Sequence, residues 1–185
     1  MTRIRILAVL VLLGTARIAA ADEAVPFAAH AGVATARAAA LSWSPDAALV
    51  WVENDEAPGP LGVAGRWSYL YYSATTDQAR VYSVRDGRIL AAENLDMKFD
   101  APPVADDWID SGRAFTAAEA AAAQGDASKK APRGALRAMV LARGTMDAAE
   151  PDRTTWTLVY SSPGAPSTFV VVDAASAKVL RTWRG

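Results

Sequence analysis

Two segments of this 185-residue sequence follow the same order of strand and turn patterns, and this internal similarity limits the fold more than any other feature. The segments span residues 66–90 and 155–180. In each one, large apolar side chains occupy alternate positions of the leading strand: Trp67, Tyr69 and Tyr71 in the first, and Trp156, Leu158 and Tyr160 in the second. Alternation with a period of two predicts a strand with one buried face. We therefore expect two related antiparallel meanders.

Each segment ends in a turn that begins at an aspartate. The pair Asp86-Gly87 is a strong hairpin pattern, because both residues tolerate the positive φ angles of tight turns. In the second segment Asp173 is followed by two alanines and Ser176, with no glycine among them. The sequence leaves the type of this second turn open.

An alanine-rich helical pattern precedes each segment. Helical spacing predicts one apolar stripe on each helix: Phe27, Ala31, Ala34, Ala38 and Leu41 on the first, and Ala114, Ala118, Ala121 and Ala122 on the second. Ser44 and Pro45 are expected to end the first helix. Asp110 or Ser111 is the expected N-cap of the second, and Gly125 lies just beyond it. A further strand-like run follows each helix, at residues 49–52 and 136–141.

These patterns predict an α+β fold of two tandem two-layer modules. A helix that precedes an antiparallel meander buries its apolar stripe on one face of that sheet, so each module is an alanine-rich helix packed on a sheet of about four strands. The expected modules span residues 22–93 and 108–185, and residues 94–107, with Pro102 and Pro103, form the expected linker. Whether the outer faces of the two sheets pack together or stay exposed is left open.

The first 21 residues have the pattern of a signal peptide. Arg3 and Arg5 precede an apolar run over residues 6–13, and small alanines at positions 19–21 suit cleavage after Ala21. The run is shorter than the roughly 20 residues that a membrane-spanning helix needs, and no later stretch is long and apolar enough either. We expect a periplasmic or secreted protein with no membrane span after cleavage.

Charge and cysteine content narrow the functional classes. Loss of Arg3, Arg5 and Arg17 lowers the count of basic residues from 19 to 16, against 20 acidic ones, which disfavours nucleic-acid binding. The chain has no cysteine, so it contains no lipid-attachment cysteine and no disulfide. Burial of apolar surface must therefore supply the stability of the folded chain.

The helices, the Trp-led strands WSYLYY and WTLVY, and the hairpin ends YSVRDGRIL and VVVDAASAKVL together resemble the tandem PepSY-like modules of exported bacterial proteins. The second copy departs from that pattern, because Ala177 stands near the place of the usual glycine in the Asp turn. The arrangement is also similar to the architecture of secreted β-lactamase inhibitor proteins. PepSY-like modules are associated with the restraint of peptidases, so the resemblance implies binding or inhibition rather than catalysis.

No residue pattern indicates a catalytic, cofactor or metal site. His30 is the single histidine and is expected at the surface or at the start of the first helix. The chain lacks a G-x-S-x-G motif and any cysteine nucleophile. Two acidic groups, residues 53–56 and residues 106–110, do not follow the spacing of a calcium-binding EF-hand loop. Whether these loops hold calcium stays open, and solvated loops are the expected interpretation.

The sequence favours a non-catalytic module that binds a protein partner in the cell envelope, such as a peptidase. Large rigid aromatic rings are common in protein interfaces. The candidate partner surface is the outer face of the sheets: Leu70, Tyr72, Tyr82, Val159 and Phe169. Two alternatives remain, a small exported hydrolase that relies on carboxylates and an envelope scaffolding protein that associates with itself. The identity of the partner and the oligomeric state cannot be derived from the sequence.

Overall fold

The computed structural model describes residues 25–95, 102–124, 134–144 and 152–185, with side chains omitted at 122–124. Three of the expectations above lie outside these residues: the signal peptide at 1–21, the helix-ending Gly125 and the middle of the linker. None of the helices in the described ranges is long and apolar enough to span a membrane.

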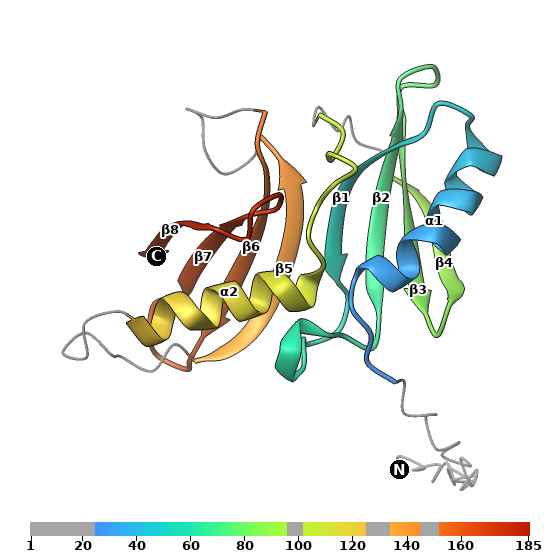
Figure 1. The fold of residues 1–185 in the computed structure, drawn as a ribbon. Helices are drawn as coiled ribbons and strands as arrows, with labels where there is room; N and C mark the ends of the chain where they lie inside the picture. The colour runs from blue at the N-terminus through green and yellow to red at the C-terminus, as the bar shows by residue number, and fades with distance from the viewer. Residues whose placement is uncertain (1–24, 96–101, 125–133, 145–151) are drawn as a thin grey trace, which may run out of the picture.

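Eight strands of the described residues form one antiparallel sheet in the order β4-β3-β2-β1-β5-β6-β7-β8 (Figure 1). The strands are β1 (Ala48–Asn54), β2 (Trp67–Ser73), β3 (Gln78–Arg85), β4 (Arg88–Leu95), β5 (Ala135–Arg143), β6 (Thr154–Ser161), β7 (Thr168–Asp173) and β8 (Val179–Arg184). The helices are α1 (His30–Trp43) and α2 (Ser111–Gln124), and a short 3-10 turn, η1 (Pro60–Gly62), lies between β1 and β2.

The two halves of the sheet are joined edge to edge. β1 pairs with β5, where Trp51 lies opposite Ala142 and Val52 lies opposite Leu141. The prediction of two tandem two-layer modules, each with its own sheet of about four strands, is therefore wrong. A strand at the edge of a sheet presents unpaired N–H and C=O groups. β1 and β5 satisfy these groups by pairing with each other, so the eight strands form one sheet with a continuous outer face.

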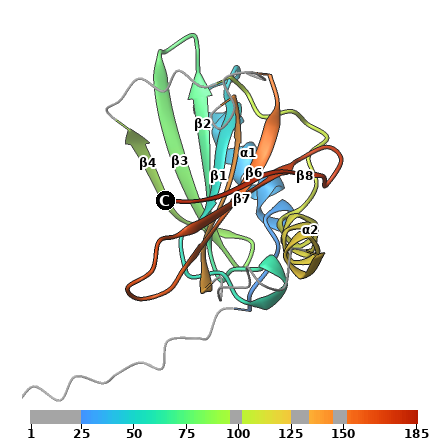
Figure 2. The ribbon, with the colours of Figure 1, turned by 90° about the vertical axis from the view of Figure 1, so that its left-hand side faces the viewer.

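Both helices cover the same face of the sheet. α1 contacts β2, β3 and β4, whereas α2 contacts β6, β7 and β8, and Figure 2 shows the strongly twisted sheet beside them. The main buried cluster runs through both halves without a break. At its centre the ring of Trp156 lies 6.1 Å from that of Trp67 and 5.8 Å from that of Trp108, both in edge contact. One hydrophobic core therefore lies beneath the two helices.

The buried side of α1 differs from the predicted stripe. Gly32, Ala36 and Ala40 are its buried residues, while Leu41 is 43% exposed. The predicted stripe on this helix was wrong, because a run of alanines shows little contrast between the two faces. In α2, Ala114 and Ala118 are buried as predicted. The predicted end of α1 is also confirmed, since Ser44 is its C-cap residue.

The predictions for the strands and turns agree with the structure. The three alternating residues of β2, Trp67, Tyr69 and Tyr71, all belong to the core under the helices. Asp86 and Gly87 have φ angles of 49° and 69°, as a tight hairpin between β3 and β4 requires. In the turn after β7 the Asp173 carboxylate accepts hydrogen bonds from the backbone N–H groups of Ala175 and Ser176, and Ala177 itself adopts the positive φ angle, 64°, that glycine usually supplies.

Candidate functional site

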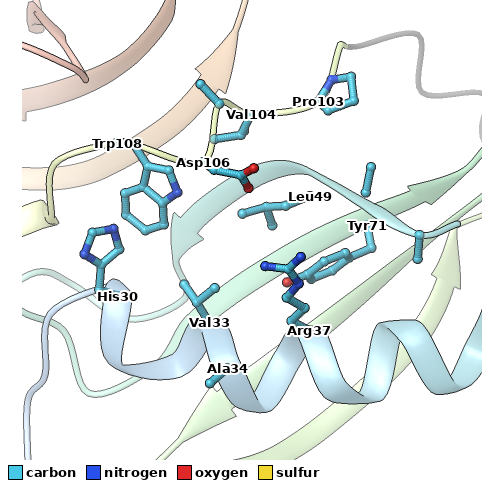
Figure 3. A pocket seen from close by; sticks show the side chains of 13 residues that line it. His30, Val33, Ala34, Arg37, Leu49, Tyr71, Pro103, Val104, Asp106 and Trp108 are labelled. Atoms are coloured by element: carbon cyan, nitrogen blue, oxygen red, sulfur yellow. The ribbon is translucent and has the colours of Figure 1, made fainter. Parts of the chain in front are cut away.

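A cleft of about 630 Å³ lies on the helix-bearing side of the sheet (Figure 3). Its walls are α1, the beginning of β1 and the segment of residues 103–108, which we call the connector because it joins the two halves of the chain. Tyr71 of β2 also lines it. The volume falls within the range of known small-molecule sites in proteins.

The connector is held in place by backbone hydrogen bonds to both halves. The N–H of Val104 donates to the carbonyl of Leu49 in β1 at 2.8 Å. The N–H of Ala105 donates to the Thr154 hydroxyl in β6 at 3.2 Å, and just after the connector the N–H of Ile109 donates to the carbonyl of Ala174 at 2.6 Å. The cleft therefore lies where the two halves meet and depends on both for its shape.

Tyr71 brings to the cleft a buried hydroxyl for which the described residues supply no hydrogen-bond partner. The residue is 2% exposed, and its hydroxyl has no hydrogen-bond partner among the described residues. Its ring packs edge-on against Tyr82, with 6.0 Å between the ring centroids. Burial raises the pKa of the Tyr71 phenol well above its usual value, although the positive charge of Arg37 acts in the opposite direction. The phenol is therefore neutral and remains a hydrogen-bond donor.

Arg37 and Asp106 bring opposite charges to the cleft. Arg37 extends from α1, where its positive charge acts on the Tyr71 phenol, and Asp106 extends from the connector on the opposite wall (Figure 3). Within the described ranges the structure records no ion pair for either side chain, so they do not neutralise each other at contact distance. Arg37 and Tyr71 thus form a pair of adjacent donors.

Apolar side chains contribute to the remaining walls, beside His30. Val33 from α1, Leu49 from β1 and Trp108 from the connector line the space between the charged groups. Trp108 is packed between His30, with ring centroids 3.7 Å apart, and Trp156. His30 is the first residue of α1, as expected for this histidine.

The opposite face of the sheet carries the other candidate site. Four of the five predicted partner-binding residues, Leu70, Tyr72, Val159 and Phe169, alternate with core residues and so lie on this outer face. Tyr82 does not, because it is 2% exposed and belongs to the core under the helices. Its expected position was wrong: it lies opposite Tyr69 in the register of β2 and β3 and therefore shares the face of Tyr69.

The outer face contains large side chains that the sequence did not single out as a surface. Trp51 and Val81 pack with Leu70 and Tyr72 around a small second buried cluster. Near β8, Phe169 and Trp183 are stacked with 5.0 Å between ring centroids and 7° between planes, and the Arg181 guanidinium lies 5.0 Å from the Trp183 ring. Only the register of the strands places Trp51 and Trp183 on this face, so their spacing in the sequence alone could not identify them.

Several carboxylates of the acidic loops are engaged in internal interactions. Asp55 accepts a hydrogen bond from Ser83 and lies 3.1 Å from Arg66, and Glu56 pairs with Arg85. Asp110 accepts the backbone N–H of His30. In the part of the chain that the structure describes, no group of three or more His, Cys, Asp or Glu side chains is placed to hold a metal ion.

Comparison with known proteins yields one structural relative and no family assignment. No protein-family model matches the sequence, and no curated protein matches it at a significant level, so the PepSY-like resemblance is not confirmed. Among solved structures, the crystal structure of a protein described as a "putative lipoprotein" from Clostridium difficile 630 has 11% sequence identity and a TM-score of 0.53. The similarity covers 78% of this chain and 87% of that protein. The chain therefore shares its fold with this clostridial protein.

Proposed function

We propose that the chain is an exported, non-catalytic binding protein that holds a protein partner against the outer face of its sheet. The observation that carries this proposal is the composition of that face. An antiparallel sheet with one solvated face normally alternates apolar residues inward with polar residues outward. Here the outward positions include Trp51, Tyr72, Val159, Phe169 and Trp183, on a face that neither α1 nor α2 covers.

The side-chain types favour a protein as the occupant. Tryptophan, tyrosine, phenylalanine and arginine are the residues most enriched in protein–protein interfaces. The stack of Phe169 and Trp183 with Arg181 combines three of these types in one rigid group, so little conformational entropy would be lost there on binding.

Two independent features support export. The first is the signal-peptide pattern of residues 1–21. The second is the structural relative, whose description as a "putative lipoprotein" is consistent with a protein of the cell envelope. Within the envelope, a peptidase is the partner class that the PepSY-like resemblance favours.

The test is a comparison of partner capture by three forms of the protein. Wild type, the outer-face double variant Phe169→Ser with Trp183→Ser, and the control Leu41→Ser would be tagged, gently cross-linked in an envelope-containing host and quantified by mass spectrometry. Leu41 is an exposed apolar residue of α1, so its replacement removes similar surface from the helix side. Circular dichroism must show that all three are folded.

The proposal expects one envelope protein that wild type and Leu41→Ser retain and the double variant loses. The purified pair should then bind with an affinity that falls at least tenfold in the double variant, as expected for the loss of a central aromatic contact. Equal capture by all three forms would contradict the proposal. Concentration-dependent self-association of wild type, abolished by the double variant, would instead favour the scaffolding alternative.

A further inference from the structure

We infer that the cleft between α1, β1 and the connector binds a small molecule that carries a carboxylate on an apolar body. This site lies on the helix-bearing side of the sheet and is independent of the partner surface proposed for the outer face. Its carboxylate would be held by the Arg37 guanidinium and the Tyr71 hydroxyl, and its apolar part would pack against Val33, Leu49 and Trp108.

The first argument is the unpartnered hydroxyl of Tyr71. Buried polar groups in folded proteins nearly always have hydrogen-bond partners, because an unmade bond leaves the cost of desolvation uncompensated. Tyr71 lines the cleft and is 98% removed from solvent, yet its hydroxyl has no acceptor among the described residues. The neighbouring buried tyrosine, Tyr69, by contrast donates to the carbonyl of Ala29 at 2.6 Å. A ligand oxygen in the cleft would supply the acceptor that Tyr71 lacks.

The second argument is the charge beside that hydroxyl. The Arg37 guanidinium can only donate hydrogen bonds, and the structure records no carboxylate bound to it within the described ranges. Two adjacent donors, one of them cationic, are complementary to an anionic acceptor with two oxygens. Val33, Leu49 and Trp108 present apolar surface between the charged groups, which favours a ligand whose charge is confined to one end.

The third argument concerns Asp106, which would distinguish between two kinds of ligand that carry such a carboxylate, a dipeptide and a fatty acid. Asp106 lines the wall opposite Arg37 (Figure 3). A ligand with an ammonium group, such as a hydrophobic dipeptide, would place its amine near this carboxylate. A fatty acid of medium length would leave Asp106 in solvent. Both ligands use Arg37 and Tyr71 in the same way.

The test uses two probes, leucyl-leucine and decanoate, each compared with its methyl ester, which lacks the carboxylate charge. Binding to the purified protein would be measured by isothermal titration calorimetry. We expect at least one free carboxylate to bind more tightly than its ester by tenfold or more. Arg37→Gln should abolish that difference, and Arg113→Gln, which changes an exposed arginine of α2, should leave it unchanged. Asp106→Asn should weaken the binding of leucyl-leucine but not that of decanoate.

Tyr71→Phe provides the sharpest readout, because the inference predicts opposite effects on binding and on folding. Loss of the hydroxyl should weaken binding of the carboxylate by about tenfold or more, because a hydrogen bond to a charged group is stronger than one between neutral groups. The same change should leave the ligand-free protein as stable as before, or more stable, because no protein partner is lost. Tyr72→Phe is the contrasting variant: its hydroxyl donates to Asp77 at 2.7 Å on the other face of the sheet, so its loss should lower the ligand-free stability and leave carboxylate binding unchanged. Binding of the esters as tight as that of the acids, or a large loss of ligand-free stability in Tyr71→Phe, would overturn the inference.

Discussion

The carboxylate of Asp110 lies 3.0 Å from the backbone nitrogen of His30 and accepts its hydrogen bond, so a residue that precedes α2 caps the first turn of α1. The adjacent Ser111 acts in the same way, because its hydroxyl accepts the N–H of Ala29 at 3.0 Å. The first N–H groups of a helix have no partner inside the helix. Here the other half of the chain supplies the partners, since the residue that precedes α1, Ala29, has no side-chain oxygen.

Replacement of Asp110 by alanine should therefore destabilise the fold although the residue is far from α1 in the sequence. We expect a loss of about 1 kcal/mol in the free energy of unfolding, the usual cost of removing a capping side chain. Urea denaturation followed by tryptophan fluorescence measures this loss. Asp107→Ala is the control, because Asp107 is exposed and should change stability little. Equal stability of the two variants would contradict a capping role for Asp110.

Gly32→Ala should destabilise α1, contrary to the general helix preference. Alanine usually stabilises a helix interior relative to glycine by about 1 kcal/mol. At position 32, however, a Cβ atom would lie 2.2 Å from the Tyr69 hydroxyl oxygen and 2.7 Å from its Cζ atom. Tyr69 is fully buried and cannot move away freely. We expect a net loss of roughly 1–3 kcal/mol, typical of overpacking, measured by thermal unfolding.

The exposed Ala38 of the same helix offers the matching control. Ala38→Gly should cost only the difference in helix propensity, about 1 kcal/mol. A Gly32→Ala variant more stable than wild type would show that Tyr69 does not pack closely against the helix.

Tyr82→Ser and Tyr72→Ser should lower the free energy of unfolding by different amounts. Tyr82 is buried in the main core, so Tyr82→Ser should lose about 3 kcal/mol or more, as do other large-to-small changes in a core. Tyr72 lies half-buried on the outer face, so Tyr72→Ser should cost clearly less. Guanidinium denaturation of both variants tests the order. The reverse order would place Tyr72, and not Tyr82, in the core.

Part of the loss of stability in acid should come from protonation of Asp46. Hydrogen bonds from the hydroxyl of Ser44, then from that of Ser73, and from the backbone N–H of Thr75 hold the pKa of Asp46 well below its usual value of 3.8. Because the folded-state pKa is lowered, this contribution is present above the unfolded-state pKa and is lost as the pH falls below it. The free energy of unfolding should therefore drop more between pH 6 and pH 3 in wild type than in Asp46→Asn. A parallel drop in both proteins would exclude Asp46 as a source.

The strands and turns could be predicted from the sequence because their patterns are local. Alternation in residues 67–71 and the Asp86-Gly87 pair depend on neighbours in the chain, and both predictions hold. The join between β1 and β5 could not be predicted in this way. Either strand would have been an acceptable edge of a separate sheet, and nothing within β1 specifies pairing with Ala142 of a distant strand.

The cleft was missed for a related reason. Arg37 stands in an alanine-rich helix, Tyr71 in an aromatic strand, and Asp106 in a segment predicted to be a linker, and no spacing rule connects the three. Tyr71 was correctly placed on the buried face, but the absence of a partner for its hydroxyl appears only when every neighbour is known. Tyr82 was misplaced because its face follows from its register with Tyr69 and not from its own segment.

The central position of β1 and β5 also has a consequence for the order of folding. Each hairpin of the sheet joins strands that follow one another in the chain, and such local contacts form early because they close short loops. The pairing of Trp51 with Ala142 closes the longest loop in the sheet. We expect it to form late, after most of the chain has been synthesised. Until then the edges of β1 and β5 are open, and each can pair with the same strand of a second molecule, so the interval before closure is the period of greatest risk of domain exchange and aggregation.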